Sequence, residues 1–288
     1  MTEPRPPIVP ELPPVEAAPR VHVFTDDRID LVPNIGVVVG DRATLVVDTA
    51  MGPRNGARVL ERVRELSTDD LTLTITHFHP EHGWGAQAFE GQAHIVYNQY
   101  QYDELREKFE SFAHLFRSFG DHVAEQLEGV RMVHPDERYG GQRELDLGGV
   151  TVQLIEHPAH TRGDQVVWLP EQRVLFAGDL VENRFFPILP DEDAHGSLWI
   201  DVLGKLEALQ PEVVVPGHGE VGGPELITAV REFLETVRER VAGAAPAAEY
   251  DLLRIQQKLE PELQQQWAHW DNPIWINFAI ARFHAELE

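Results

Sequence analysis

Three histidines and a glutamate lie within six positions of the segment "THFHPEHGWG", residues 76–85. They are His77, His79, Glu81 and His82, and imidazole and carboxylate groups are ligands that Zn²⁺, Fe and Mn²⁺ accept in proteins. Side chains alternate along an extended segment, so His77 and His79 project in the same direction. The intervening proline fits the first position of a helix, which places Glu81 and His82 in its first turn. The segment therefore predicts one part of a metal site whose other ligands come from later in the chain.

Three later residues stand where such distant ligands are expected. His160 lies in "EHPAHTRGD", Asp179 in "VLFAGDL" and His218 in "VVVPGHGE", and each follows an apolar run that predicts a β-strand. Residues at strand ends are held by a rigid scaffold, as a metal site requires. Asp48 follows another such run, in "LVVDTAMG". We expect Asp48 to orient a histidine N–H rather than to bind metal, with a turn residue as the alternative.

These residues require a fold that brings several strand ends together. The apolar pattern predicts strands at 21–24, 29–40, 43–48, 71–76, 150–156, 165–170, 173–178 and 212–219. It predicts helices at about 53–66, at about 101–128, from 224 onward and within 246–288. Two strand-rich halves, each with its own helices, favour an α+β sandwich over a regular βαβ winding.

The composition of the 288-residue chain is that of a globular protein, with 42% hydrophobic and 25% charged residues and no apolar run of transmembrane length. The 24 basic and 48 acidic residues give a formal charge of 24 − 48 = −24, which counts against nucleic acid and anionic membranes as partners. Cysteine is absent, which excludes thiolate ligands and makes a cytoplasmic location the expectation. Residues 1–20 are rich in proline, lack a signal-peptide pattern and are expected to form a disordered or extended tail.

Taken in order, the quoted segments resemble the signature of the metallo-β-lactamase-fold hydrolases. That signature is HxHxDH, a histidine in a GHTxGS-like segment, an aspartate in GD and a histidine in PGHG, and the chain has "HFHPEH", "AHTRGD", "AGD" and "PGHG". The resemblance covers about residues 21–235 and implies a four-layer αββα sandwich. We therefore expect a catalytic domain at 21–245, with a helical insertion at about 101–128. A C-terminal helical extension at 246–288 is expected to pack on this domain or on a partner subunit.

The resemblance also implies a site for two divalent metal ions, with Zn²⁺ favoured and Fe or Mn²⁺ as alternatives. The first ion would be held by His77, His79 and His160 and the second by His82, His218 and Glu81, with Asp179 bridging the two. Two metals about 3.5–4 Å apart can share a hydroxide, because binding to Zn²⁺ lowers the pKa of water from about 15.7 to about 7. Asp179 would then assist as proton acceptor.

Two positions depart from the family pattern. Glu81 stands where the family has aspartate and is one methylene longer, so it would reach the second metal, displace that metal outward, or act as a base beside it. Asp164 stands where the family has serine after the GHTxG segment, which affects a hydrogen bond behind the ligands. His157 matches no motif position and is interpreted as structural or as a support for a ligand.

The predicted function is hydrolysis of an ester, thioester, lactone or related bond of a small molecule. With aspartate at position 179, the chain resembles the glyoxalase II, lactonase and phosphodiesterase branches, and the absence of cysteine counts against true β-lactamases. A phosphodiesterase is less favoured. The alternative is a persulfide-dioxygenase-like oxidoreductase with one iron on His77, His160 and Asp179. The expected partner is a small-molecule substrate, a homodimer is a further possibility, and Trp84, Phe185 and Phe186 are candidates for the pocket wall.

Overall fold

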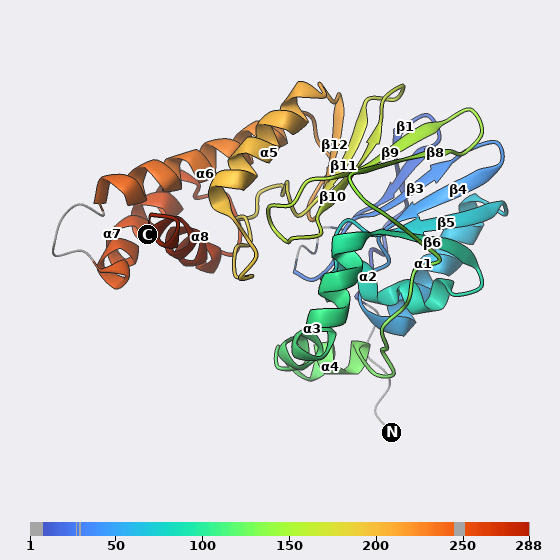
Figure 1. The fold of residues 1–288 in the computed structure, drawn as a ribbon, viewed down its shortest axis with the longest axis horizontal. Coiled ribbons are helices and arrows are strands. Elements are labelled where there is room, and N and C mark those ends of the chain that lie inside the picture. The colour runs from blue at the N-terminus through green and yellow to red at the C-terminus, as the bar shows by residue number, and fades with distance from the viewer. Residues whose placement is uncertain (1–7, 27, 29, 245–250, 288) are drawn as a thin grey trace.

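Two β-sheets pack together in the computed structural model, which describes residues 8–26, 28, 30–244 and 251–287 (Figure 1). The first sheet has seven strands in sequence order: β1 (Val15–Ala18), β2 (Val21–Phe24), β3 (Ile35–Val39), β4 (Ala43–Val47), β5 (Asp70–Thr74), β6 (Ala93–Asn98) and β7 (Glu137–Tyr139). The second has five, in the order β12 (Val213–Pro216), β11 (Val174–Gly178), β10 (Gln165–Leu169), β9 (Thr151–Glu156) and β8 (Gln142–Asp146).

Parallel strand pairs bring the ends of successive strands to one edge. Strands β4, β5, β6 and β7 are parallel neighbours in the first sheet, and β11 and β12 are parallel in the second. The carboxyl ends of parallel neighbours point the same way, so the loops that follow β4 and β5, and those that follow β11 and β12, emerge together. All the site residues predicted above lie in such loops, in the loop after β9, or in the short helix α2 (Pro80–Gly83) that follows the loop after β5.

Helices cover the outer face of each sheet, which gives the αββα layers. On the seven-stranded sheet lie α1 (Gly52–Leu66), α2 (Pro80–Gly83), the 3-10 helix η1 (Trp84–Phe89), α3 (Gln99–Arg117) and α4 (Asp121–Gln126). On the five-stranded sheet lie α5 (Gly196–Ala208) and α6 (Glu225–Ala244). The strands alternate accordingly: Val38 and Val174 face the space between the sheets, whereas Val37 and Leu175 face the helices. The predicted α+β sandwich is confirmed.

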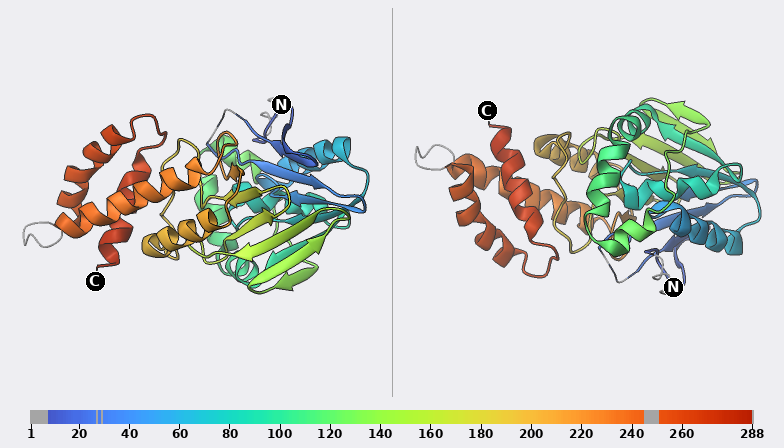
Figure 2. Two further views of the ribbon diagram at one scale, coloured as in Figure 1. Left: turned by 90° about the horizontal axis from the view of Figure 1, so that it is seen from above. Right: turned by 90° about the horizontal axis from the view of Figure 1, so that it is seen from below.

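Two further helices, α7 (Leu252–Gln266) and α8 (Ile274–Ala285), end the described chain. Figures 1 and 2 show α6 running outward from the sheets, with α7 and α8 beside its far half. Phe233 of α6 packs edge-on against Trp267, with ring centroids 5.2 Å apart, and also contacts Trp270 at 5.6 Å. Trp267 and Trp270 are therefore buried within the chain's own helical layer. No helix among the described residues is long and apolar enough to cross a membrane.

The N-terminal segment differs from the predicted tail. Residues 1–7 lie outside the described part of the chain, but Val9 is 1% exposed within the hydrophobic cluster beneath α1, and β1 pairs with β2. Arg62 of α1 donates hydrogen bonds to the carbonyls of Pro10 and Leu12. Proline lacks an N–H but leaves its carbonyl available, so a Pro-rich segment can be held in an extended form by donors from the body of the protein.

The helical stretch predicted at 101–128 is divided. α3 ends at Arg117 and α4 begins at Asp121, with Gly120 between them at φ +129°. This backbone conformation interrupts an α-helix and is readily adopted by glycine, so α4 folds back against the end of α3. The apolar stripe along 105–123 continues across the break, which is why the pattern alone suggested a single helix.

Candidate metal centre

Loops after five strands converge at one edge of the paired sheets. The segment between β5 and α2 carries His77 and His79, and the short helix α2 carries Glu81 and His82. Pro80 begins α2, as the sequence predicted. The other contributing loops follow β4, β9, β11 and β12 and carry Asp48, His160, Asp179 and His218. The tertiary structure thus brings together every residue for which a metal-binding role was predicted.

The first group contains His77, His79, His160 and Asp179, with one possible ligand atom of each within 4.8 Å of the others. The Nε2 atom of His160 lies 3.1 Å from Nδ1 of His79. The Nε2 atoms of His77 and His160 each lie 3.7 Å from Oδ2 of Asp179. All four side chains are buried. Three imidazoles and a carboxylate oxygen therefore surround one point.

The second group contains Glu81, His82, Asp179 and His218, again within 4.8 Å of one another. The Nε2 atoms of His82 and His218 are 3.2 Å apart, and they lie 3.0 and 3.8 Å from Oδ1 of Asp179. Asp179 therefore directs one oxygen to each group. A Cβ atom on Gly217 would lie 2.0 Å from Asp179 Oδ1, so the glycine of "PGHG" makes the space that this carboxylate occupies.

Unpartnered buried atoms show that the two groups suit cations. Among the described residues, His77 Nε2, Glu81 Oε2 and Asp179 Oδ2 are buried without a hydrogen-bond partner. Buried polar atoms of this kind are costly unless something satisfies them. Neutral imidazoles and carboxylates with no thiolate are the ligand set of Zn²⁺, Fe or Mn²⁺ sites. The residues present therefore fit a pair of divalent ions.

Each of the five histidines has a neighbour at the ring nitrogen that points away from its group, within hydrogen-bond distance for four of them and at ion-pair distance for His79. The pairs are His77 Nδ1 with Thr76 Oγ1 at 3.1 Å, His82 Nδ1 with Asp48 Oδ2 at 2.9 Å, His160 Nδ1 with the Ile188 carbonyl at 2.8 Å, His218 Nδ1 with the Val32 carbonyl at 3.1 Å, and His79 Nε2 with Asp191 Oδ2 at 3.6 Å. Such partners set the tautomer and orientation of metal-binding imidazoles.

Asp48 and Asp164 hold the loops that carry the histidines. Asp48, at φ +68°, accepts a hydrogen bond from the Thr76 N–H at 2.7 Å in addition to its contact with His82. This is the orienting position that the sequence indicated. Asp164 accepts the N–H groups of His160 at 2.7 Å and Thr161 at 2.9 Å. Burial raises the pKa of Asp164 to about 6. The aspartate at this departure from the family pattern therefore shapes the loop around His160.

Charge is distributed unevenly among the buried groups. Burial lowers the pKa of His77 well below its usual value, and His82 lowers it further, so His77 is neutral, the form that binds metals. Burial also disfavours protonation of His82, but Asp179 and Asp48 outweigh this effect and hold its pKa well above its usual value. Burial acts to raise the pKa of Asp179, yet the adjacent His82 keeps it well below the usual range. His82 Nε2 lies 3.0 Å from Asp179 Oδ1, so each of the two groups favours the charged form of the other.

The sequence that builds this centre matches a known protein family. The family model for the metallo-beta-lactamase superfamily matches residues 28–218, which include both ligand groups. The chain belongs to this superfamily. It is 25% identical over 233 residues to a linear primary-alkylsulfatase from Pseudomonas sp., covering 69% of this chain and 43% of that protein. It is 29% identical over 209 residues to a type 2 metallo-beta-lactamase from Bacteroides fragilis, covering 71% and 76%.

A solved structure shares the fold along nearly the whole chain. A metallo-beta-lactamase family protein from Thermus thermophilus superposes with a TM-score of 0.67 at 19% identity, and the match covers 93% of each chain. The resemblance to metallo-β-lactamase-fold proteins that the motifs indicated is therefore confirmed. The matched superfamily consists mostly of metal-dependent hydrolases, and the His and Asp cluster supports a divalent-metal site in this member.

Two carboxylates beside the metal centre, Asp191 and Glu182, were not identified from the sequence. Asp191 faces His79, and Glu182 accepts the His218 N–H at 2.9 Å. Burial raises the pKa of Glu182 well above its usual value, and the nearby Asp179 raises it further. Glu182 follows Asp179 by three positions, which is the one signal that could have drawn attention to it. Asp191 lies in a loop without any periodic pattern.

The predicted wall residues have different surroundings. The ring of Phe185 stacks on His218, with centroids 6.2 Å apart. Trp84 instead donates its indole N–H to the Phe78 carbonyl, and Phe186 packs against Phe233, so both belong to the core. His157 is half-buried, and burial lowers its pKa to about 4, but it belongs to neither ligand group.

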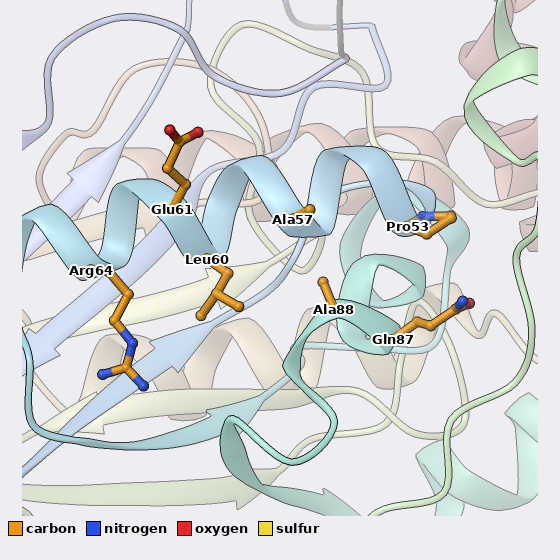
Figure 3. Close-up of a pocket in the computed structure, with 7 residues that line it drawn as sticks. All are labelled: Pro53, Ala57, Leu60, Glu61, Arg64, Gln87 and Ala88. Carbon is orange, nitrogen blue, oxygen red and sulfur yellow. The ribbon is translucent and has the colours of Figure 1, made fainter.

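A separate surface hollow lies between α1 and η1 (Figure 3). Its lining residues are Pro53, Ala57, Leu60, Glu61, Arg64, Gln87 and Ala88. None of them belongs to the two ligand groups. The hollow is thus distinct from the metal centre of this superfamily member.

Proposed function

We propose that the protein is a hydrolase with a dinuclear metal centre that cleaves an ester, thioester, lactone or related bond of a small molecule. The observation that supports this most directly is the position of Asp179, whose two oxygens face two separate and complete ligand groups. A mononuclear iron enzyme requires only the first group. The buried Glu81, His82 and His218 therefore favour the dinuclear hydrolase over the dioxygenase alternative.

When bound, two divalent ions would supply an acidified water as nucleophile and an electrophile for the developing oxyanion. The chain's own part is to place these ions and to exclude bulk water, since all seven ligand side chains are buried. The low-dielectric surroundings strengthen every charge interaction there. Asp179 lies between the two groups and is the proposed proton acceptor. Glu81, whose Oε2 atom lacks a partner, is the second proposed catalytic carboxylate.

A row of phenylalanines beside the centre favours a substrate with an apolar substituent. The ring of Phe112 stacks on His79 at 5.2 Å, Phe112 and Phe116 are 6.3 Å apart, and Phe116 and Phe119 are 5.0 Å apart. The last of these rings is 48% exposed. Ligand sites combine apolar walls with a few polar groups, as this arrangement does. The name of the Pseudomonas relative, a linear primary-alkylsulfatase, is compatible with such a substituent.

The remaining proposals concern metal, partner and location. We favour Zn²⁺, with Fe or Mn²⁺ as alternatives, because the ligands are imidazoles and carboxylates. A small molecule is the proposed partner rather than nucleic acid, given the formal charge of −24. A cytoplasmic location is proposed from the absence of cysteine.

We predict two transition-metal ions per chain after purification in the presence of zinc. Elemental analysis checks the number, and a panel of ester, thioester, lactone, phosphodiester, sulfate-ester and β-lactam substrates checks the bond that is cleaved. A content of one ion or fewer would contradict the dinuclear proposal. A single iron together with oxygen consumption on a persulfide would favour the dioxygenase instead.

Replacement of Glu81 tests its proposed place at the second metal. Glu81→Gln is expected to lower the affinity for the second ion about 10–100-fold, because the amide carries no negative charge. The first ion should stay bound. Glu81→Asp changes only the reach of the carboxylate and should also lower second-site occupancy if the centre is adapted to the longer side chain. Unchanged zinc content and turnover in Glu81→Gln would remove Glu81 from the site. Glu61→Gln, at an exposed position of α1, is the control and should keep the zinc content and turnover of the wild type.

A further inference from the structure

His79 is oriented oppositely to the other four histidines. It directs Nδ1 toward its group, 3.1 Å from His160 Nε2, whereas the other four direct Nε2 inward. The outward nitrogen of His79 is therefore Nε2, and it faces Asp191 Oδ2 at 3.6 Å. This distance is that of an ion pair and not of a hydrogen bond, and the negative charge of the carboxylate favours the tautomer with the proton on Nε2, which leaves the lone pair of Nδ1 for a metal.

Asp191 is held in turn by Lys108 of α3. The Nζ atom of Lys108 donates to Asp191 Oδ1 at 2.9 Å, to Asp193 at 2.6 Å and to Glu104 at 3.0 Å. The Lys108 side chain is only 19% exposed, and Asp191 and Glu104 are buried. One ammonium group thus holds together three carboxylates that would otherwise repel one another.

Helix α3 also forms hydrogen bonds with the segments that carry His77 and His160. Glu104 accepts the Gly163 N–H at 2.7 Å, in the loop after His160. Gln101 donates to the Ile75 carbonyl at 2.7 Å, just before His77. A Cβ on Gly163 would lie 2.5 Å from the Gln101 backbone nitrogen, so the helix and the loop are in close contact. These contacts hold α3 in place beside the ligand loops, so the position of Lys108 relative to Asp191 is fixed.

The loop that carries Asp191 is fixed from its other side as well. Arg282 of α8 donates to the Asp191 carbonyl at 2.5 Å and to the Glu192 carbonyl at 3.3 Å. Glu286, the residue directly after α8, accepts the N–H groups of Gly196 at 2.6 Å and Ser197 at 3.0 Å, where α5 begins. The backbone of this loop is thus held by α8, while the Asp191 side chain is directed by α3.

We propose that Lys108 and Asp191 are positioning residues for the first metal: Lys108 holds Asp191 against His79 Nε2, and this contact directs His79 Nδ1 to the ion. The inference rests on the proposed metal centre and adds to it a specific role for the helical insertion. Neither residue contacts the ion itself. Their loss therefore lowers affinity for the first ion without removing any ligand.

Zinc binding to the metal-free full-length protein, measured by competition with a chromophoric chelator, tests the proposal. Lys108→Met and Asp191→Asn are each expected to weaken the first zinc about 10–100-fold, as for other residues that orient metal-binding histidines. Lys108→Arg, which keeps the positive charge, should restore most of the affinity. Co²⁺ absorption spectra supply a second readout, because a reoriented imidazole changes the ligand field of the first ion.

Two matched controls separate positioning from general loss of charge. Asp193→Asn removes another Lys108 contact but not the contact to His79, and Lys205→Met removes an exposed lysine of α5. Both should keep wild-type zinc affinity. Circular dichroism of the metal-free variants checks folding, and Asp191→Asn tests the same contact without changing α3 should Lys108→Met fail to fold.

The outcomes distinguish this inference from the proposed function. Wild-type protein that binds no zinc would overturn both. Wild-type protein that binds two zinc ions, with Asp191→Asn equal to it, would overturn the positioning role alone. An Asp193→Asn variant as weak as Asp191→Asn would also overturn it, because the charge cluster and not the His79 contact would then matter.

Discussion

Asp179→Asn is expected to abolish turnover and to reduce zinc content from two ions to one or fewer. The two Asp179 oxygens face different ligand groups, so a neutral amide weakens both ions at once. Removal of a residue that merely orients a ligand costs about 10–100-fold in metal affinity. Loss of a shared ligand should cost more than about 100-fold by the same measure. Chelator competition and elemental analysis measure the affinity, and the best substrate of the panel measures turnover.

The control for this experiment is Asp201→Asn, on an exposed position of α5. It changes the net charge by the same amount and is expected to keep zinc content and turnover. Asn closely matches the shape of Asp, so the buried site should not collapse for steric reasons. Two retained zinc ions in Asp179→Asn, bound as tightly as in the wild type, would show that Asp179 does not link the two groups, and its assignment as the shared ligand would fail.

Deletion of residues 1–19 is expected to destabilise the protein by about 3–5 kcal/mol. It removes Val9 from the core beneath α1, and full burial of a valine contributes about 1.5–3 kcal/mol. It also removes the carbonyls of Pro10 and Leu12 that accept from Arg62, and hydrogen bonds to charged groups contribute about 1.5–3 kcal/mol each. Recovery of hydration by Arg62 offsets part of the loss. At about 2–4 °C per kcal/mol, the thermal midpoint should fall by roughly 10 °C.

A pair of matched substitutions identifies the contribution of Val9. Val9→Ala and Val15→Ala make the same chemical change at a buried and at a 44% exposed position, so only the first should lower the midpoint. An equally stable protein without residues 1–19 would mean that the packing of Val9 and the Arg62 contacts contribute little to folding.

The ligand residues were within reach of the sequence because each has a local signal. His77, His79 and His82 are close neighbours in the chain, and His160, Asp179 and His218 each follow an apolar run. A strand end is a local property, since it depends on hydrophobic period and turn residues. The α+β sandwich followed from the same patterns. Sheets and amphipathic helices must bury their apolar faces against one another, and only a few layered architectures achieve this.

The packing at the N-terminus could not be predicted in the same way. Its stability depends on Arg62, which is about fifty residues away in sequence and meets Pro10 and Leu12 only after α1 has packed on the sheet. The proline content described the composition of the segment correctly, but composition does not reveal a distant donor. The break in the 101–128 stretch could not be located from the sequence either. It lies at Gly120, whose positive φ allows α4 to pack back against α3, and this packing is a tertiary contact.

By itself, the sequence determined which side chains are available as ligands and that they stand at strand ends. Only the tertiary structure decided how each imidazole is turned. His79 presents Nδ1 because Asp191 lies at its Nε2, and Asp191 is there because Lys108 of α3 and Arg282 of α8 hold it. These partners are separated from His79 by about 30 to 200 positions in the chain. For His79 the tautomer and direction depend on these long-range contacts, which no local pattern encodes.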